Sequence, residues 1–162
     1  MIDVFTDASL IKKNNTFSIG YAIHFPNKEF ENIVDSIDVH PSNADIHYAE
    51  MYGIYTAIII TKSKCSDHIN IYTDSMHSVN AIYKWINIYY EHGLDKLITN
   101  KKNPIKNRDI LVKIFDQING VQNNYTFTHV KAHTRSAEYK FVNNKSVDIM
   151  VRKHIRNSFK NK

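Results

Sequence analysis

Two short stretches of this sequence are nearly alike, and each carries an aspartate after an apolar run. Asp7 lies in FTDAS and Asp74 lies in YTDSM. The preceding residues are β-branched and aromatic, which predicts a strand before each aspartate. A predicted helix separates the two strands, so they should lie parallel, with both carboxylates at the carboxyl edge of the sheet, where open α/β folds bind ligands. A turn role for Asp7 and a helix N-cap role for Asp74 are the structural alternatives.

Glu50 lies within the apolar stripe of a predicted helix that begins near Ala44. The apolar residues recur at three- and four-residue steps, at Ile46, Ala49, Gly53, Ile54, Ala57 and Ile58. This spacing is typical of one buried helix face. An uncompensated buried carboxylate is costly or takes up a proton, so Glu50 needs a cation, a hydrogen-bond network or water at the sheet edge. A buried salt bridge, or a stripe edge that reaches solvent, is the structural alternative.

A fourth acid, Asp148, adjoins the apolar side of the predicted C-terminal helix, one turn before Val151. A solvated helix position is its structural alternative. Clustered carboxylates repel one another unless cations lie between them, and ligand sets made of oxygen atoms select Mg²⁺ or Mn²⁺. Two such ions can activate a water and stabilise a leaving oxygen in phosphodiester hydrolysis. That chemistry requires acids on different elements to meet at one edge of the sheet.

The elements that must position these acids follow from the apolar pattern. We expect strands at 2–7, 16–25, 29–39, 68–73 and 124–131, and helices from about 44, from 74 to about 90, at 108–118 and from about 143 to 159. Three strands joined by short turns form an antiparallel meander, and the later crossovers add two parallel strands. We therefore predict an α/β fold with a five-stranded mixed sheet flanked by helices. Residues 1–162 should form one domain, with a basic protrusion at about 84–108.

Composition narrows the class of protein. The formal net charge is +5 and the pI is about 9.2, which favours a polyanionic partner without requiring one. Cys65 is the only cysteine, so no internal disulfide can form, and we expect a buried thiol. No apolar run is long enough to span a bilayer, and the start MIDVFTD lacks the pattern of a signal peptide. We expect a soluble intracellular protein that is a monomer and does not bind a membrane. The sequence does not distinguish a cytoplasmic from a nuclear location.

The ordered set of acids resembles the type 1 ribonucleases H, the ribonuclease HI-like family. The four acids occur in the family's order and in its contexts, which here read FTDAS, YAEMYGIYTAI, YTDSMHSVNAIYKW and NNKSVDIMV. HVKAH, which ends at His133, is similar to the family's segment with a mobile histidine, and PIKNRDI (104–110) is similar to its segment after the basic protrusion. TDS alone is a common string, whereas the ordered set covers nearly the whole chain and is specific.

The resemblance implies a ribonuclease H-like fold and a metal-dependent endonuclease. Such an enzyme would hydrolyse the RNA strand of RNA–DNA hybrids by two-metal-ion catalysis, leaving 5′-phosphate and 3′-hydroxyl ends. Asp7 would bridge two Mg²⁺ ions, for which Mn²⁺ can substitute. Asp148 would help to hold the ion that activates water, and Glu50 and Asp74 the ion on the leaving-group side. His133 would assist proton transfer or product release; without the resemblance it is one of 9 histidines and fits a surface loop.

Candidate contacts to the hybrid come from the first turn, the protrusion and the last helix. They are Ser9, Asn14, Asn15, Lys84, Tyr89, Lys101, Lys102, Lys106 and Asn144. The short polar groups of the first turn could read the 2′-hydroxyl of RNA, and the protrusion lysines could bind phosphates. Tyr89 would lie against the DNA strand and Asn144 near a phosphate, by the resemblance. Turn, cap or core roles are the structural alternatives.

The chain departs from the family's pattern at three places. The first turn is KKNN (12–15) where relatives are Gly-rich. Ile46 and His47 stand where the family commonly has an Asn or Gln that contacts nucleic acid. Leu94 replaces a common tryptophan of the protrusion. These departures bear on hybrid binding and remove no metal ligand.

Three other readings remain open from the sequence. A DNA junction resolvase or an integrase-like nuclease shares the acid cluster but lacks the combination of basic protrusion and HVKAH loop. A hybrid- or duplex-binding module without activity is disfavoured because all four acids are present. An interaction domain without a catalytic site does not explain the ordered acids.

Overall fold

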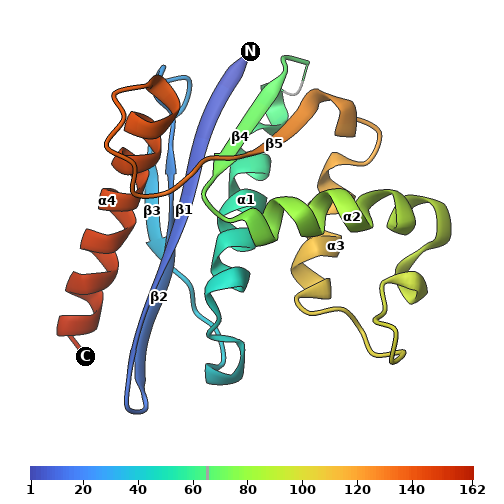
Figure 1. Cartoon of the computed structure of the whole chain (residues 1–162), viewed down its shortest axis with the longest axis horizontal. Helices are drawn as coiled ribbons and strands as arrows, with labels where there is room; N and C mark the ends of the chain where they lie inside the picture. Colours follow the sequence, from blue (N-terminus) through green and yellow to red (C-terminus); the bar gives the residue numbers. More distant parts are fainter. Residues whose placement is uncertain (65) are drawn as a thin grey trace.

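A computed structural model describes residues 1–64 and 66–162, so the thiol predicted to be buried at Cys65 lies outside the described residues. The described residues form a five-stranded mixed sheet of order β3-β2-β1-β4-β5. Its strands are β1 (Ile2–Lys13), β2 (Thr16–His24), β3 (Ile33–Ser36), β4 (Ile69–Thr73) and β5 (Tyr125–His129). The β1–β2 and β2–β3 pairs are antiparallel, and the β1–β4 and β4–β5 pairs are parallel (Figure 1). The predicted meander with parallel additions is therefore confirmed.

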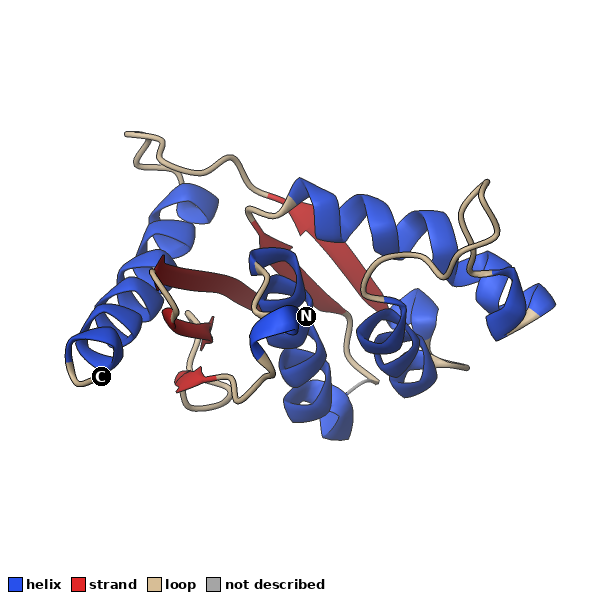
Figure 2. Ribbon diagram, turned by 90° about the horizontal axis from the view of Figure 1, so that it is seen from below, coloured by secondary structure: helices blue, strands red, loops and turns tan. Residues whose placement is uncertain are grey.

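Helices cover both faces of the sheet. They are α1 (Ile46–Thr61), α2 (Met76–His92), α3 (Arg108–Ile118) and α4 (Tyr139–Lys160). Figure 2 shows α4 on one side of the sheet and α1 on the other, with α3 packed on α1. Short 3₁₀ helices lie at Pro41–Asn43, Lys62–Lys64, Leu94–Lys96 and Gln122–Asn124. Within the described part of the chain, no helix is both long enough and apolar enough to cross a bilayer.

Alternation along the strands divides the apolar side chains between two cores. Side chains such as Val4 and Ile23 join the larger core beneath α1. On the opposite face a smaller cluster contains Phe5 and Ala22 of the sheet together with the buried face of α4. That face consists of Val147, Val151 and Ile155, each fully buried. Burial of such a side chain contributes about 1.5–3 kcal/mol, so this stripe fixes α4 on the sheet.

β1 is longer than the sequence pattern predicted. It continues past Asp7 to Lys13, and the β1–β2 hairpin closes with Lys13 opposite Thr16. The turn is therefore Asn14-Asn15 alone, and Asn14 takes a left-handed conformation with φ 57°, which asparagine tolerates better than most residues. The prediction that Asp7 closes its strand is wrong. What ends there is the parallel pairing with β4, whose last partner in β1 is Thr6.

Two other boundaries differ from the prediction. β3 was expected over 29–39 but spans only Ile33–Ser36, because Asn32 accepts a hydrogen bond from the Phe25 backbone N–H at 2.8 Å and holds the preceding residues in a turn. A short strand is also typical at a sheet edge. α4 begins at Tyr139 rather than near 143, because the Tyr139 ring packs edge-on against Phe5 at 6.0 Å and anchors the first turn.

Gly20 of β2 lies directly against α4. A Cβ atom at this position would lie 2.6 Å from Cδ1 of Ile155 and would also collide with the backbone oxygen of Asp35. We expect Gly20→Ala to lower the free energy of unfolding by about 1–3 kcal/mol, the usual cost of overpacking. Urea unfolding followed by circular dichroism measures it.

Thr16→Ala is the matched control for this prediction, because Thr16 is exposed at the start of the same strand. Its free energy of unfolding should stay within about 0.5 kcal/mol of the wild-type value. Equal stabilities of the two variants would show that α4 does not pack against Gly20 as described.

Candidate active site

Three carboxylates meet at the carboxyl edge of the parallel strands. One oxygen each from Asp7, Glu50 and Asp74 lie within 4.8 Å of one another. They come from β1, from α1 and from the segment that follows β4. The structure thus brings together three of the four acids that the sequence singled out.

The β1–β4 register explains why Asp7 and Asp74 are neighbours. Thr6 and Thr73 are the last paired residues of the two parallel strands, so the aspartates occupy the next position on each. The N-cap of α2 is Ser75, whose side-chain oxygen accepts a hydrogen bond from the Ser78 N–H at 3.2 Å. The helix therefore does not use Asp74 as its cap, and that alternative is wrong.

Glu50 reaches the cluster from the opposite face of the sheet. It is 6 % exposed, and its Oε2 atom has no hydrogen-bond partner among the described residues. Asp7 is 3 % exposed; its Oδ1 accepts from the Ala8 N–H at 2.8 Å, whereas its Oδ2 is without a partner in the described part of the chain. No salt bridge among the described residues involves either carboxylate. The alternative of a buried salt bridge is therefore excluded for Glu50 within those residues.

Electrostatics in the cluster favours protons or cations. Burial, followed by the neighbouring carboxylates of Asp74 and Asp148, raises the pKa of Asp7 to about 9. Burial and then the charge of Asp7 raise the pKa of Glu50 well above its usual value. The pKa of Asp74 is raised mainly by burial. Buried carboxylates with unpartnered oxygens and no nitrogen or sulfur donor fit a hard divalent cation such as Mg²⁺.

Asp148 lies beside this trio on α4. Its side chain is 19 % exposed and pairs with Arg152, one turn along the helix, at 3.5 Å. Its proximity also raises the pKa of Asp7. The predicted fourth acid is therefore next to Asp7, although it is not among the three whose oxygens lie within 4.8 Å of one another.

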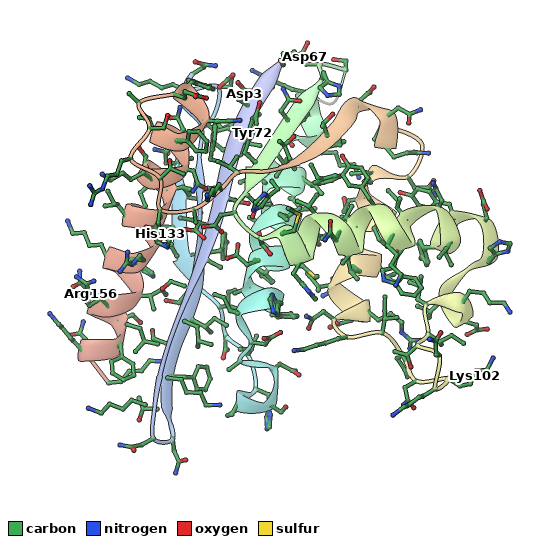
Figure 3. All side chains as sticks on the ribbon, viewed as in Figure 1. Asp3, Asp67, Tyr72, Lys102, His133 and Arg156 are labelled. Carbon is green, nitrogen blue, oxygen red and sulfur yellow. The ribbon has the colours of Figure 1, made fainter. Side chains whose placement is uncertain are left out.

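A cleft of about 300 Å³ opens between α4 and the loop after β5. Asp74, His133, Asn144 and Asp148 all line it. His133 is exposed and has a left-handed backbone with φ 56°, and Figure 3 shows it between the sheet and α4. Asn144 is 4 % exposed, and its Oδ1 is another buried oxygen without a partner among the described residues. The cleft thus joins the acids to the predicted histidine and asparagine.

The predicted contacts in the first turn lie at different distances from the acids. Ser9 is half-buried and two residues beyond Asp7, so it shares a face of β1 with that acid. Asn14 and Asn15 are exposed at the hairpin tip. Seven residues of extended strand separate Asn14 from Asp7, roughly 23 Å. The structure therefore places Ser9, but neither asparagine, near the acids.

The predicted contacts in the protrusion are dispersed along it. Lys101 and Lys102 are exposed, and Figure 3 shows Lys102 at the far end of the molecule from α4. Lys106 is exposed and forms an ion pair with Asp45, the N-cap of α1, at 3.5 Å. Lys84 lies over the Trp85 ring, 4.9 Å from its centroid.

Tyr89 joins α2 to α3. Its hydroxyl donates a hydrogen bond to Asp116 at 2.7 Å, and its ring lies 5.8 Å from that of Phe115. These contacts are those of a packing residue between helices. A contact of Tyr89 with a DNA strand stays a prediction.

Other residues line the cleft whose place in it was not predicted from the sequence. Lys131, Arg135, Lys145 and Arg152 line the cleft, so its wall is basic as well as acidic. The string HVKAHTR carried two of these cations, yet spacing alone does not tell which side of a loop faces a cleft. Outside the cleft, the stacking of the His47 and His77 rings, whose centroids lie 4.0 Å apart, was not predicted because they come from two different helices.

Comparisons with known proteins agree with this geometry. The family model described as RNase H matches residues 1–156. A curated relative, "Probable ribonuclease H" of Acanthamoeba polyphaga mimivirus, is 29% identical over 136 residues, which cover 81% of this chain and 56% of the relative. The chain thus spans little more than half the length of that relative.

Solved structures share the fold. The PFV RNase H domain superposes with a TM-score of 0.74 at 18% identity, covering 96% of this chain and 94% of that domain. The foamy viral protease-reverse transcriptase in complex with an RNA/DNA hybrid gives 0.67 at 15% identity, over 94% of this chain and 19% of the other. LC9-RNase H1, a type 1 RNase H with the type 2 active-site motif, superposes with a TM-score of 0.64 at 14% identity. The superposition covers 96% of this chain and 72% of that protein.

The raised pKa of Asp7 predicts how stability depends on pH in the absence of divalent ions. The folded chain retains the Asp7 proton up to about pH 9, whereas the unfolded chain loses it near the ordinary aspartate pKa of 3.8. Stability should therefore fall as pH rises between these values. Asp7→Asn removes this titrating group, so the free energy of unfolding of the variant relative to wild type should rise with pH. Between acidic and neutral pH the rise should exceed about 1.4 kcal/mol.

Thermal and urea unfolding in EDTA at several pH values measure this difference. Asp67→Asn is the matched control, because Asp67 is exposed and precedes β4, whereas Asp74 follows the other end of that strand. The difference in stability between Asp67→Asn and wild type measures the effect of removing a carboxyl outside the cluster. If Asp7→Asn behaves like that control, the buried carboxyl does not carry the shifted pKa.

Proposed function

The chain belongs to the RNase H family, and on that premise we propose that it is an endoribonuclease that hydrolyses the RNA strand of RNA–DNA hybrids. The observation that carries the proposal is the cluster of Asp7, Glu50 and Asp74, with oxygens within 4.8 Å of one another. Carboxylates held this close in a buried setting suit divalent cations that bind a phosphodiester. Both the mechanism with two Mg²⁺ ions and the 5′-phosphate and 3′-hydroxyl products belong to the proposal.

The roles of the four acids follow from their places around the cluster. Asp7 is near each of the other acids: its oxygen lies within 4.8 Å of those of Glu50 and Asp74, and the charge of Asp148 acts on it, so it is suited to contact two cations. Glu50 and Asp74 would hold one cation with it, and Asp148 would help to hold the other. When bound, the ions supply Lewis-acid stabilisation of the phosphate and lower the pKa of water.

The chain's own residues would handle the substrate around the acids. Asn144 has a buried oxygen without a described partner and lines the cleft, so its amide is placed to contact a group that enters there. His133 is exposed on the cleft wall, where it can exchange a proton with the departing strand. Arg152 holds Asp148 at 3.5 Å and so orients that carboxylate.

An RNA–DNA hybrid is the substrate that best matches the surroundings of the acids. One structural neighbour is a reverse transcriptase in complex with an RNA/DNA hybrid. In this chain Lys101 and Lys102 are exposed on the protrusion, where they can bind phosphates of the uncut strand. Ser9, two residues beyond Asp7 on the same face of β1, would meet a 2′-hydroxyl near the acids.

A cleavage assay tests the proposal. Labelled RNA–DNA hybrid, double-stranded RNA, double-stranded DNA and a four-way DNA junction are incubated with Mg²⁺, with Mn²⁺ or with EDTA. We expect cleavage of the RNA strand of the hybrid alone, only with a divalent ion, and products with 5′-phosphate ends. Cleavage of the junction alone would contradict the substrate assignment.

Asp74→Asn tests the chemistry in the same assay. It removes one anionic ligand while keeping the shape of the side chain, so cleavage should fall by a factor of roughly 10³ or more. Binding of the hybrid, measured by fluorescence anisotropy, should persist. Asp67→Asn, at an exposed position, should leave both unchanged. Full cleavage by Asp74→Asn would refute the role of this residue as a cation ligand.

A further inference from the structure

The solvent face of α4 carries a row of cations. Lys145, Arg152 and Arg156 recur at intervals of seven and four residues, and all three are exposed. Such spacing places side chains on one side of a helix. The opposite side is the buried stripe that holds α4 on the sheet. The row therefore faces away from the core, and Figure 3 shows Arg156 at the outer side of α4.

This row continues out of the catalytic cleft. A second depression on α4 is lined by Ile149, Arg152, Lys153 and Arg156. Two of these residues, Ile149 and Arg152, also line the cleft that contains Asp74 and Asp148. The two hollows therefore adjoin, and a chain leaving the cleft over Arg152 would meet Lys153 and Arg156 next.

Charge along this path is largely uncompensated. Arg152 pairs with Asp148 at 3.5 Å, but no salt bridge among the described residues involves Lys145, Lys153 or Arg156. The second depression has no acidic residue in its lining. Cations left free on a surface beside a phosphodiester-cleaving site are suited to a phosphate backbone.

We propose that this row is a phosphate-binding track for the cut strand of the hybrid beyond the scissile phosphate. We call Lys145, Arg152, Lys153 and Arg156 the α4 track. The proposal rests on the proposed function and extends it to a second arm of the substrate. From Lys145 to Arg156 the helix rises about 16 Å, which corresponds to about five nucleotides along a duplex axis.

The track and the protrusion lie on opposite sides of the molecule. Figure 3 shows Lys102 at one end of the molecule and Arg156 on the other side of the sheet, with His133 between them. A hybrid centred on the acids would therefore be held on both sides. An anionic membrane is a poorer match, because Ile149 is the only apolar residue in the lining of the second depression and an interfacial helix needs a broad apolar face.

The salt dependence of binding tests the track. The double variant Lys153→Ala with Arg156→Ala removes two cations from the part of the track that does not line the catalytic cleft. Fluorescence anisotropy with a hybrid of about 20 base pairs is recorded over a series of salt concentrations. The slope of log K against log salt should become shallower by about 2, at about 0.9 per lost phosphate contact, and Kd should rise roughly tenfold at low salt. KM for hybrid cleavage should rise with Kd.

A matched pair of charge losses elsewhere serves as the control. Lys62 and Lys113 are exposed and lie outside α4, so Lys62→Ala with Lys113→Ala should leave the slope unchanged. The charge-conserving pair Lys153→Arg with Arg156→Lys should restore the wild-type slope. Circular dichroism and thermal unfolding check that each variant is folded.

The possible outcomes separate this inference from the proposed function. If wild-type protein cuts the hybrid and the α4 double variant has the same slope as the control, the track is refuted while the function stands. A double variant that loses binding to phosphatidylserine vesicles, yet binds hybrid as wild type does, would also overturn it. If wild-type protein neither cuts nor binds the hybrid, the proposed function fails and the track fails with it.

Discussion

Repulsion among buried carboxylates is the constraint on which the rest of this structure depends. Asp7 and Glu50 are almost fully buried, and each has an oxygen without a hydrogen-bond partner among the described residues. Left alone, such groups take up protons, as the raised pKa of each shows. They can be charged at neutral pH only if cations replace those protons. The charged form of the cluster is therefore unfavourable until divalent ions bind. The surrounding fold must hold the carboxylates close together in their absence.

The scaffold does this with regular elements rather than loops. Asp7 lies in the middle of a strand that continues to Lys13, so the residues before and after Asp7 are both paired with β2. Gly53 lets α1 approach β2, because a Cβ atom there would be 3.3 Å from that of Tyr21. Gly20 does the same for α4 on the other face. Close packing on both faces thus fixes acids from different elements at one edge.

Features that depend on local sequence patterns could be predicted from the sequence. A glutamate inside an apolar stripe predicted a buried carboxylate, and the pair FTDAS and YTDSM predicted neighbouring aspartates, which the structure confirms. The antiparallel and parallel pairing followed from the order of the elements along the chain, and the approximate positions of the strands and helices followed from periodicity. The length of β1 was mispredicted because pairing with β2 extends it past the last contact with β4. The pairing of Tyr89 with Asp116 and of Arg152 with Asp148 depends on how side chains meet in three dimensions, and neither was predicted.

The most direct test is the number of protons released when cations bind. Mg²⁺ and Mn²⁺ are titrated by calorimetry at neutral pH in two buffers that differ in ionisation enthalpy, with wild-type protein and with Asp7→Asn. If cations displace protons from the buried carboxyls, binding to wild type should release about one proton or more per chain, and the variant should release fewer. Cation binding without proton release, or no cation binding by the wild-type protein, would contradict this account of the site.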